Sequence, residues 1–241
     1  MLGMQRALSL IYPDQCILCP ELVETTGGLC ASCWREMPFL RGLVCNTCGV
    51  SLPGHGDAEV AQCDECLVMA PPWVAGRAAL AYRDKARRLV LLLKHGDRPD
   101  LAGPAASWME AAGRPIMTPD MLLGPVPIHW SRLISRRYNQ SVELGRKLSR
   151  QTGLPFCPDA LCRTRRTPVQ DGLGVDARRA NVAGAVCANP RHRAQFAGRD
   201  ICLIDDVMTS GATLSAAADA CHDAGARRVT VLVLARVEKA P

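Results

Sequence analysis

The stretch RDICLIDDVMTSGATL, residues 199–214, decides the fold of this 241-residue chain. It contains a short apolar run, residues 201–204, of the kind used by a strand that is buried on both faces of a parallel sheet. Two adjacent carboxylates, Asp205 and Asp206, follow this run, and small or hydroxylic residues occupy positions 209–213. The order of these features predicts a buried strand, then a tight turn, then a helix.

An anion site is predicted where the turn meets the helix. The alanine-rich residues 214–224 form the predicted helix, and Gly225 fits the left-handed position that follows its last turn. Backbone N–H groups point outward at a helix N-terminus, and the helix dipole adds favourable potential, so a phosphate is stabilised there. Gly211 lets the backbone approach such a ligand closely. Three hydroxyl side chains supply further donors: Thr209, Ser210 and Thr213.

The two carboxylates would repel a phosphate that touched them. Asp205 and Asp206 suit instead a neighbouring group that offers hydroxyls, or a divalent metal ion. A ribose 5-phosphate has its hydroxyls and its phosphate at a suitable separation for both halves of the stretch. The alternative is an ordinary strand-to-helix turn with solvent-facing acids, and the full Thr-Ser-Gly-Ala-Thr run after two aspartates makes that alternative the weaker one.

Size and composition allow one ordinary domain and one small module. The chain has a mass of 26.0 kDa, and 48% of its residues are hydrophobic but only 4% are aromatic. Aliphatic side chains must therefore form most of the core. The longest apolar runs, such as residues 89–93, are too short to span a bilayer, and the first residues lack the apolar segment of a secretory signal. These features predict a cytoplasmic protein without membrane insertion.

Eight of the thirteen cysteines form four Cys-x-x-Cys pairs in the N-terminal part of the chain. In a reducing compartment such pairs favour metal over disulfides, and two pairs complete a tetrahedral four-thiolate zinc site. The spacing is compatible with two successive zinc ribbons, although a pairing of first with fourth and second with third also remains open. Such sites leave no position for water, so the zinc ions are predicted to be structural. The predicted ligands are Cys16, Cys19, Cys30, Cys33, Cys45, Cys48, Cys63 and Cys66.

Charge divides the chain at the same place. Residues 1–70 contain three basic and eight acidic side chains, whereas residues 71–241 contain 26 basic and 15 acidic ones. Two consecutive prolines, Pro71 and Pro72, mark the predicted boundary between the zinc ribbon module and the second domain. The acidic balance of the module argues against a phosphate-dominated contact with nucleic acid. The module is therefore interpreted as structural or as a surface for protein contacts.

The rest of the chain alternates between strand and helix patterns, which predicts an α/β fold with a parallel sheet and flanking helices. In such sheets ligands bind at the carboxyl ends of the strands. The predicted segments are strands at 73–82, 121–127 and 229–234, helices at 86–93 and 101–112, a break at 94–99, a basic helix-rich stretch at 132–152 and a mobile polar loop at 162–182.

With these segments in place, the chain resembles the ComF/GntX family from end to end. That family joins a double zinc ribbon to a type I phosphoribosyltransferase domain, and the stretch 204–213 resembles the phosphoribosyl pyrophosphate (PRPP) motif of such transferases. Two departures appear: RRYNQ at 136–140, where the family usually has RGFNQ, and Val186 in place of Phe. The other matching pieces are the four cysteine pairs, Tyr82, residues 88–90, 93–94, 125–127, 137–140, 163–170, 178–181 and 184–185.

The resemblance implies a role for three parts of the sequence. Residues 93–96 would form the loop that meets the pyrophosphate, and residues 163–170 would lie in a flexible hood over the substrate. Asp205, Asp206 and Lys94 are the implied catalytic residues. The positions implied to contact PRPP and its Mg²⁺ are Lys94, His95, Gly96, Arg163, Arg178, Asp205, Asp206, Val207, Met208, Thr209, Ser210, Gly211, Ala212 and Thr213.

The expected function is the transfer of a phosphoribosyl group from PRPP to an unidentified acceptor. Two alternatives stay open: a PRPP or nucleotide sensor without turnover, and an adaptor that associates with single-stranded DNA or with DNA-uptake proteins, as the family's link to competence implies. The adaptor would use the basic second domain, where an ordinary solvated helix face explains the charge equally well. The basic residues concerned are Arg132, Arg136, Arg137, Arg146, Lys147 and Arg150.

Overall fold

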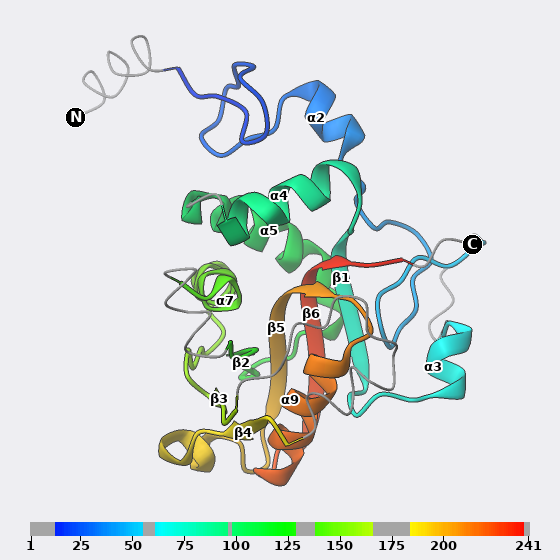
Figure 1. The fold of residues 1–241 in the computed structure, drawn as a ribbon, viewed down its shortest axis with the longest axis vertical. Helices are drawn as coiled ribbons and strands as arrows, with labels where there is room; N and C mark the ends of the chain where they lie inside the picture. The colour runs from blue at the N-terminus through cyan, green and yellow to red at the C-terminus, as the bar shows by residue number, and fades with distance from the viewer. Residues whose placement is uncertain (1–12, 55–60, 96–97, 129–137, 166–183, 239–241) are drawn as a thin grey trace.

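A four-stranded parallel sheet with the order β1-β6-β5-β2 forms the centre of the protein (Figure 1). The computed structural model describes residues 13–54, 61–95, 98–128, 138–165 and 184–238. The predicted α/β parallel fold is confirmed. The strands are β1 (Ala75–Ala81), β2 (Leu122–Pro125), β5 (Asp200–Met208) and β6 (Arg228–Arg236).

Helices cover both faces of this sheet. On one face lie α4 (Asp84–His95), α5 (Ala102–Gly113) and α7 (Gln140–Thr152), and on the other lies α9 (Ala212–Asp223). Each strand therefore needs apolar side chains in both directions, which explains the unbroken apolar runs in the sequence. In β5, Cys202 and Ile204 pack toward α4, α5 and α7, whereas Ile201 and Leu203 pack toward α9.

A smaller antiparallel sheet precedes β5. It pairs β3 (Leu161–Arg163) with β4 (Val186–Ala188), and a 3₁₀ helix, η3 (Pro190–Gln195), follows before β5 begins. Two further 3₁₀ turns flank α5: η1 (Pro99–Leu101) and η2 (Arg114–Ile116). The strand β3 contains the first two residues of the predicted mobile loop, so that loop prediction is wrong at its beginning. Its remainder from residue 166 lies outside the described residues.

The cysteine-rich segment packs against the sheet in two places. After α2 (Ala31–Glu36), the chain runs beside the edge strand β1, where Leu40 N donates to Ala79 O at 3.0 Å. The part that precedes α3 (Asp64–Val68) meets the beginning of β1, where Gly76 N donates to Asn46 O at 2.9 Å. A Cβ on Gly76 would lie 2.4 Å from Thr47 O, so only glycine allows this approach. The boundary at residue 70 stays a prediction.

The predicted elements are present with shifted ends. The strand predicted at 201–204 is confirmed as the buried part of β5, which continues through both aspartates to Met208. The helix predicted at 214–224 begins two residues earlier, and Gly225 has the expected left-handed backbone, with φ = +93°. The predicted break at 94–99 is wrong at its beginning, because α4 continues through His95. No helix within the described ranges combines the length and hydrophobicity that crossing a membrane requires.

Candidate functional site

The predicted anion site lies between β5 and α9, at the carboxyl edge of the sheet. Its residues, 209–213, are called the phosphate turn after the ligand predicted for them. Gly211 caps the helix with a left-handed backbone, φ = +76°, which positions the first amides of α9 outward. Ser210 Oγ is buried, and among the described residues it has no hydrogen-bond partner. A buried hydroxyl without a partner is costly, so an acceptor oxygen placed at this turn would satisfy it.

The two aspartates at the end of β5 have different partners. Asp206 Oδ1 lies 3.1 Å from Lys94 Nζ, with both side chains largely buried. Asp205 Oδ1 accepts hydrogen bonds from Ser141 Oγ and from the Asp206 backbone N–H, each at 2.9 Å. The last turn of α4 therefore brings Lys94 next to Asp206, and the contact of Lys94 with a diphosphate stays a prediction. Ser141, at the beginning of α7, is a contact that the sequence analysis missed.

Burial, and next the charge of Asp206, raise the pKa of Asp205 from 3.8 to about 7, against the opposing effects of Ser141 and Lys94. An unfolded aspartate loses its proton near its ordinary pKa, so between these two values the folded state binds more protons than the unfolded state. The stability of the ligand-free protein should therefore fall as the pH rises through this window, and level off above about pH 7.

This pH dependence can be measured with one substitution. Asp205→Asn removes the carboxyl group. The urea midpoint of this variant should therefore exceed that of wild type by most at about pH 8 and by least at about pH 5. A gain of about 1–3 kcal/mol at the higher pH is expected. An equal difference between the two proteins at both pH values would contradict the raised pKa.

The segment before α7 holds the end of α4 in place. Tyr138 Oη and Gln140 Nε2 both donate to Leu93 O, the carbonyl immediately before Lys94. Asn139 caps α7 by accepting from Ser141 N at 3.0 Å, and it donates to Val126 O beyond β2 at 3.1 Å. The motif that supported the family resemblance thus positions Lys94 and Asp205 from one short stretch.

Trp73 supports the phosphate turn from the side of the zinc ribbons. Its ring lies under Gly211, where an added Cβ would be 3.1 Å from Trp73 Cη2. Its Nε1 donates to Thr47 O at 2.7 Å, inside the Cys45–Cys48 pair. A buried tryptophan next to two prolines carried no pattern that linked it to the site. The side chain of Trp73 therefore contacts both the Cys45–Cys48 turn and the phosphate turn.

Arg236, at the end of β6, is a second link between the Cys45–Cys48 turn and the phosphate turn. Its side chain is buried, and its Nη1 lies within hydrogen-bond distance of the carbonyl oxygens of Met208, Thr209 and Val237. The contact with Cys45 and burial raise the pKa of the Cys48 thiol, and the positive charge of Arg236 opposes that rise. The only signal in the sequence was an arginine that ends an apolar strand, which is equally typical of a solvent-exposed end.

The eight paired cysteines form two compact clusters. In each cluster the four sulfur atoms lie within 4.8 Å of one another, and the pairing is successive, first with second and third with fourth. Burial and neighbouring sulfurs raise the pKa of Cys33 to about 12, and burial and the charge of Cys45 raise that of Cys66 to about 12. Only a cation lets four such thiols ionise together, so both clusters fit structural zinc.

The remaining predicted contacts are less well placed. His95 is exposed in the last turn of α4, and Arg163 lies in β3, opposite Val186. Gly96 and Arg178 lie outside the described residues, as does most of the predicted hood. Val207, Met208, Thr209 and the beginning of α9 follow the aspartates directly, as predicted. The described site therefore consists of the two acids, Lys94 and the phosphate turn.

Comparison with known proteins adds three findings. Residues 7–67 match the family model of the double zinc ribbon domain. DNA utilization protein YhgH of Salmonella typhi is 30% identical over 237 residues, covering 94% of this chain and 99% of that protein. Competence protein F of Haemophilus influenzae is 27% identical over 229 residues, covering 92% and 96%. The allosteric regulatory enzyme of purine biosynthesis superposes with a TM-score of 0.40 and 17% identity, over 60% of this chain and 30% of that one.

Proposed function

We propose a function for this chain from the premise that it belongs to the ComF family, the family of DNA utilization protein YhgH and competence protein F. The carboxyl edge of its sheet binds PRPP, and the bound phosphoribosyl group passes to an acceptor while pyrophosphate leaves. The observation that carries this proposal is the buried Ser210 hydroxyl without a partner, one turn beyond two aspartates that are held in place by Lys94 and Ser141.

Each part of PRPP has a matching group in the described site. Amides and hydroxyls of residues 209–213 receive the 5-phosphate, and Ser210 Oγ gains the acceptor that it lacks. Asp205 and Asp206 accept from the two ribose hydroxyls, because carboxylates are acceptors that sit beside the phosphate turn without touching it. Lys94 Nζ, now 3.1 Å from Asp206, is close enough to turn toward the diphosphate.

The chemistry of such a transfer requires positioning and charge stabilisation. The anomeric carbon becomes electron-poor as the diphosphate leaves, and its two neighbouring carboxylates stabilise that positive charge. Lys94 stabilises the negative charge on the leaving group. The hard oxygens of Asp205 and Asp206 also suit Mg²⁺, which would supply further neutralisation of the diphosphate when bound. Effects of this type typically contribute several kcal/mol to barrier lowering.

The double variant Asp205→Asn/Asp206→Asn tests the site. We expect the ligand-free protein to remain folded, because asparagine fills the same space as aspartate and Lys94, which keeps its charge, is partly exposed to solvent. PRPP-dependent thermal stabilisation should vanish, which corresponds to a loss of at least about 100-fold in affinity, or about 2.7 kcal/mol. Asp219→Asn on α9 is the control, since that exposed acid should leave the stabilisation intact. Unchanged stabilisation in the double variant would refute the assignment.

A second measurement, the release of pyrophosphate, distinguishes a protein that turns PRPP over from one that only binds it. Release of pyrophosphate from PRPP in the presence of candidate acceptors indicates a transferase, whereas stabilisation without release under all acceptors indicates a sensor. The role in DNA metabolism that the relatives' names state is proposed for this chain as the biological setting of the reaction. Direct DNA contact is the weaker candidate, because Arg146 on the basic helix α7 is already paired with Glu143.

A further inference from the structure

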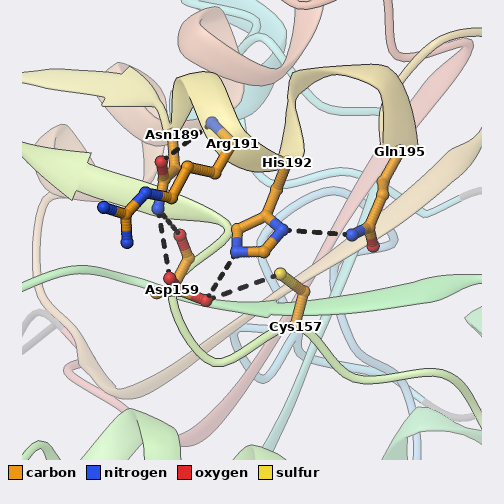
Figure 2. A network of polar contacts seen from close by, with 6 residues as sticks. All are labelled: Cys157, Asp159, Asn189, Arg191, His192 and Gln195. Atoms are coloured by element: carbon orange, nitrogen blue, oxygen red, sulfur yellow. Dashed lines mark hydrogen bonds and ion pairs between the residues drawn. The ribbon is translucent and has the colours of Figure 1, made fainter.

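A third cluster of metal-ligating side chains lies at the opposite end of β5 from the phosphate turn. Cys157 and Asp159 come just before β3, and His192 comes from η3 after β4 (Figure 2). One sulfur, one carboxylate oxygen and one ring nitrogen of these residues lie within 4.8 Å of one another. The cluster is separate from both four-cysteine sites and from the residues proposed to bind PRPP.

We propose that Cys157, Asp159 and His192 bind a third divalent cation of the zinc class. The His192 Nε2–Asp159 Oδ1 distance is 3.0 Å, and the Cys157 Sγ–Asp159 Oδ1 distance is 3.9 Å. A tetrahedral zinc ion with its usual bond lengths holds such ligand atoms about 3.3–3.6 Å apart. Each observed distance therefore lies within about half an ångström of the value that zinc requires.

Neighbouring groups orient the exposed ligand, Asp159, and the half-buried ligand, His192. Asn189 Nδ2 donates to Asp159 Oδ2 at 3.1 Å and to the Asp159 carbonyl at 2.9 Å, which holds the carboxylate toward His192. Gln195 lies 3.2 Å from His192 Nδ1 (Figure 2). With the amide rotated to present its oxygen, Gln195 accepts the Nδ1 proton and leaves the Nε2 lone pair for the cation. Ligating histidines and carboxylates are commonly supported in this way.

The donor set selects the kind of cation. A thiolate and an imidazole favour zinc-class ions over Mg²⁺ or Ca²⁺, and one thiolate with one carboxylate neutralises a 2+ charge. The alternative is a surface His–Asp ion pair beside a buried cysteine that acts as a small apolar residue. That alternative fits the apolar packing of Cys157, but it does not account for a sulfur, a carboxylate oxygen and a ring nitrogen that all lie within 4.8 Å of one another.

Such a cation would connect Cys157 and Asp159, which precede β3, with His192, which follows β4. Its ligands come from both sides of the β3–β4 pair, so binding would fix the beginning of β3 and the end of β4 relative to each other. Three protein ligands leave a fourth position for water, unlike the two closed four-cysteine sites. The site is proposed independently of PRPP binding and would persist if the transferase proposal failed.

The metal content of the whole protein tests this proposal. After equilibration with micromolar free zinc, elemental analysis should give three zinc ions per chain for wild type and two for Cys157→Ser and His192→Gln. Cys187→Ser, a half-buried cysteine outside all three clusters, is the control and should retain three. Cobalt loading should add a thiolate-to-cobalt absorption band for the third equivalent, absent from Cys157→Ser.

A variant of Asp159, the exposed ligand, still tests the proposal if Cys157→Ser fails to fold. Asp159→Asn changes a side chain that is 58% exposed, so it should fold normally and bind the third zinc ion at least about tenfold more weakly. Two zinc ions in wild type at saturating free zinc would overturn the proposal. A third zinc ion that survives in Asp159→Asn, His192→Gln and Cys187→Ser with equal affinity would overturn it as well.

Discussion

Cys48→Ser should remove one zinc ion and weaken PRPP binding at least about tenfold at temperatures where the rest of the protein is still folded. Serine is a poor zinc ligand, so the variant should lose the zinc ion of this cluster. The three remaining thiols are then left at a buried site with no cation to let them ionise. Structural zinc binding is worth about 10–16 kcal/mol in small domains, so a loss of several kcal/mol in stability is expected. Zinc content and the urea midpoint measure this first effect.

The effect on PRPP follows from the contacts behind the phosphate turn. Thr47, between Cys45 and Cys48, holds Trp73 Nε1 at 2.7 Å, and the Trp73 ring supports Gly211. When the Cys45–Cys48 turn loses its zinc, Trp73 loses its anchor and the amides of the turn lose their fixed direction. Isothermal titration with PRPP at low temperature should detect a loss of at least about tenfold in affinity.

The first cluster supplies the matched control. Cys19→Ser should also lose one zinc ion, but its cluster packs on the face of the sheet that carries α4 and α5, away from Trp73. PRPP affinity should change less than in Cys48→Ser at equal loss of stability. Equal losses of affinity in both variants would contradict a local link between the second cluster and the phosphate turn.

Local pattern predicted the fold well because parallel sheets leave a strong local signal. The apolar run 201–204 had to be buried on both faces, and a helix with Gly225 at its end had to follow. The end of β5 was not predictable in the same way. Its pairing with β6 continues from Asp205 opposite Val233 to Met208 opposite Arg236, so hydrogen bonds to a distant strand extend it past the acids.

The candidate site was predictable where its residues are adjacent in sequence, and otherwise only in part. Asp205, Asp206 and the phosphate turn belong to one stretch, and resemblance added Lys94. Ser141 contacts Asp205 across 64 residues, and Trp73 contacts Gly211 from an even more distant part of the chain. A single serine or tryptophan carries no pattern at that range. The zinc pairing was equally ambiguous, because either arrangement of four Cys-x-x-Cys pairs satisfies the same spacing.

Arg236→Met should lower the free energy of unfolding by about 1–3 kcal/mol, because backbone carbonyls lose a charged hydrogen-bond donor in a buried place. The guanidinium is 7% exposed, and its Nη1 serves carbonyls of Met208, Thr209 and Val237. Without it those carbonyls lose a buried donor, and the cysteine cluster loses the positive charge beside Cys48. PRPP affinity should fall at least about tenfold, because Met208 and Thr209 lead directly into the phosphate turn.

Two further variants separate the geometry of Arg236 from its charge. Arg236→Lys keeps the charge but offers a compact ammonium that cannot replace the planar guanidinium, so its stability should lie between wild type and Arg236→Met. Arg114→Met removes an arginine that is 75% exposed and pairs only with Glu110 at the surface, so it should cost less than about 1 kcal/mol. Urea unfolding measures all three. Equal midpoints for Arg236→Met and Arg114→Met would show that Arg236 does not join the second zinc cluster to the phosphate turn.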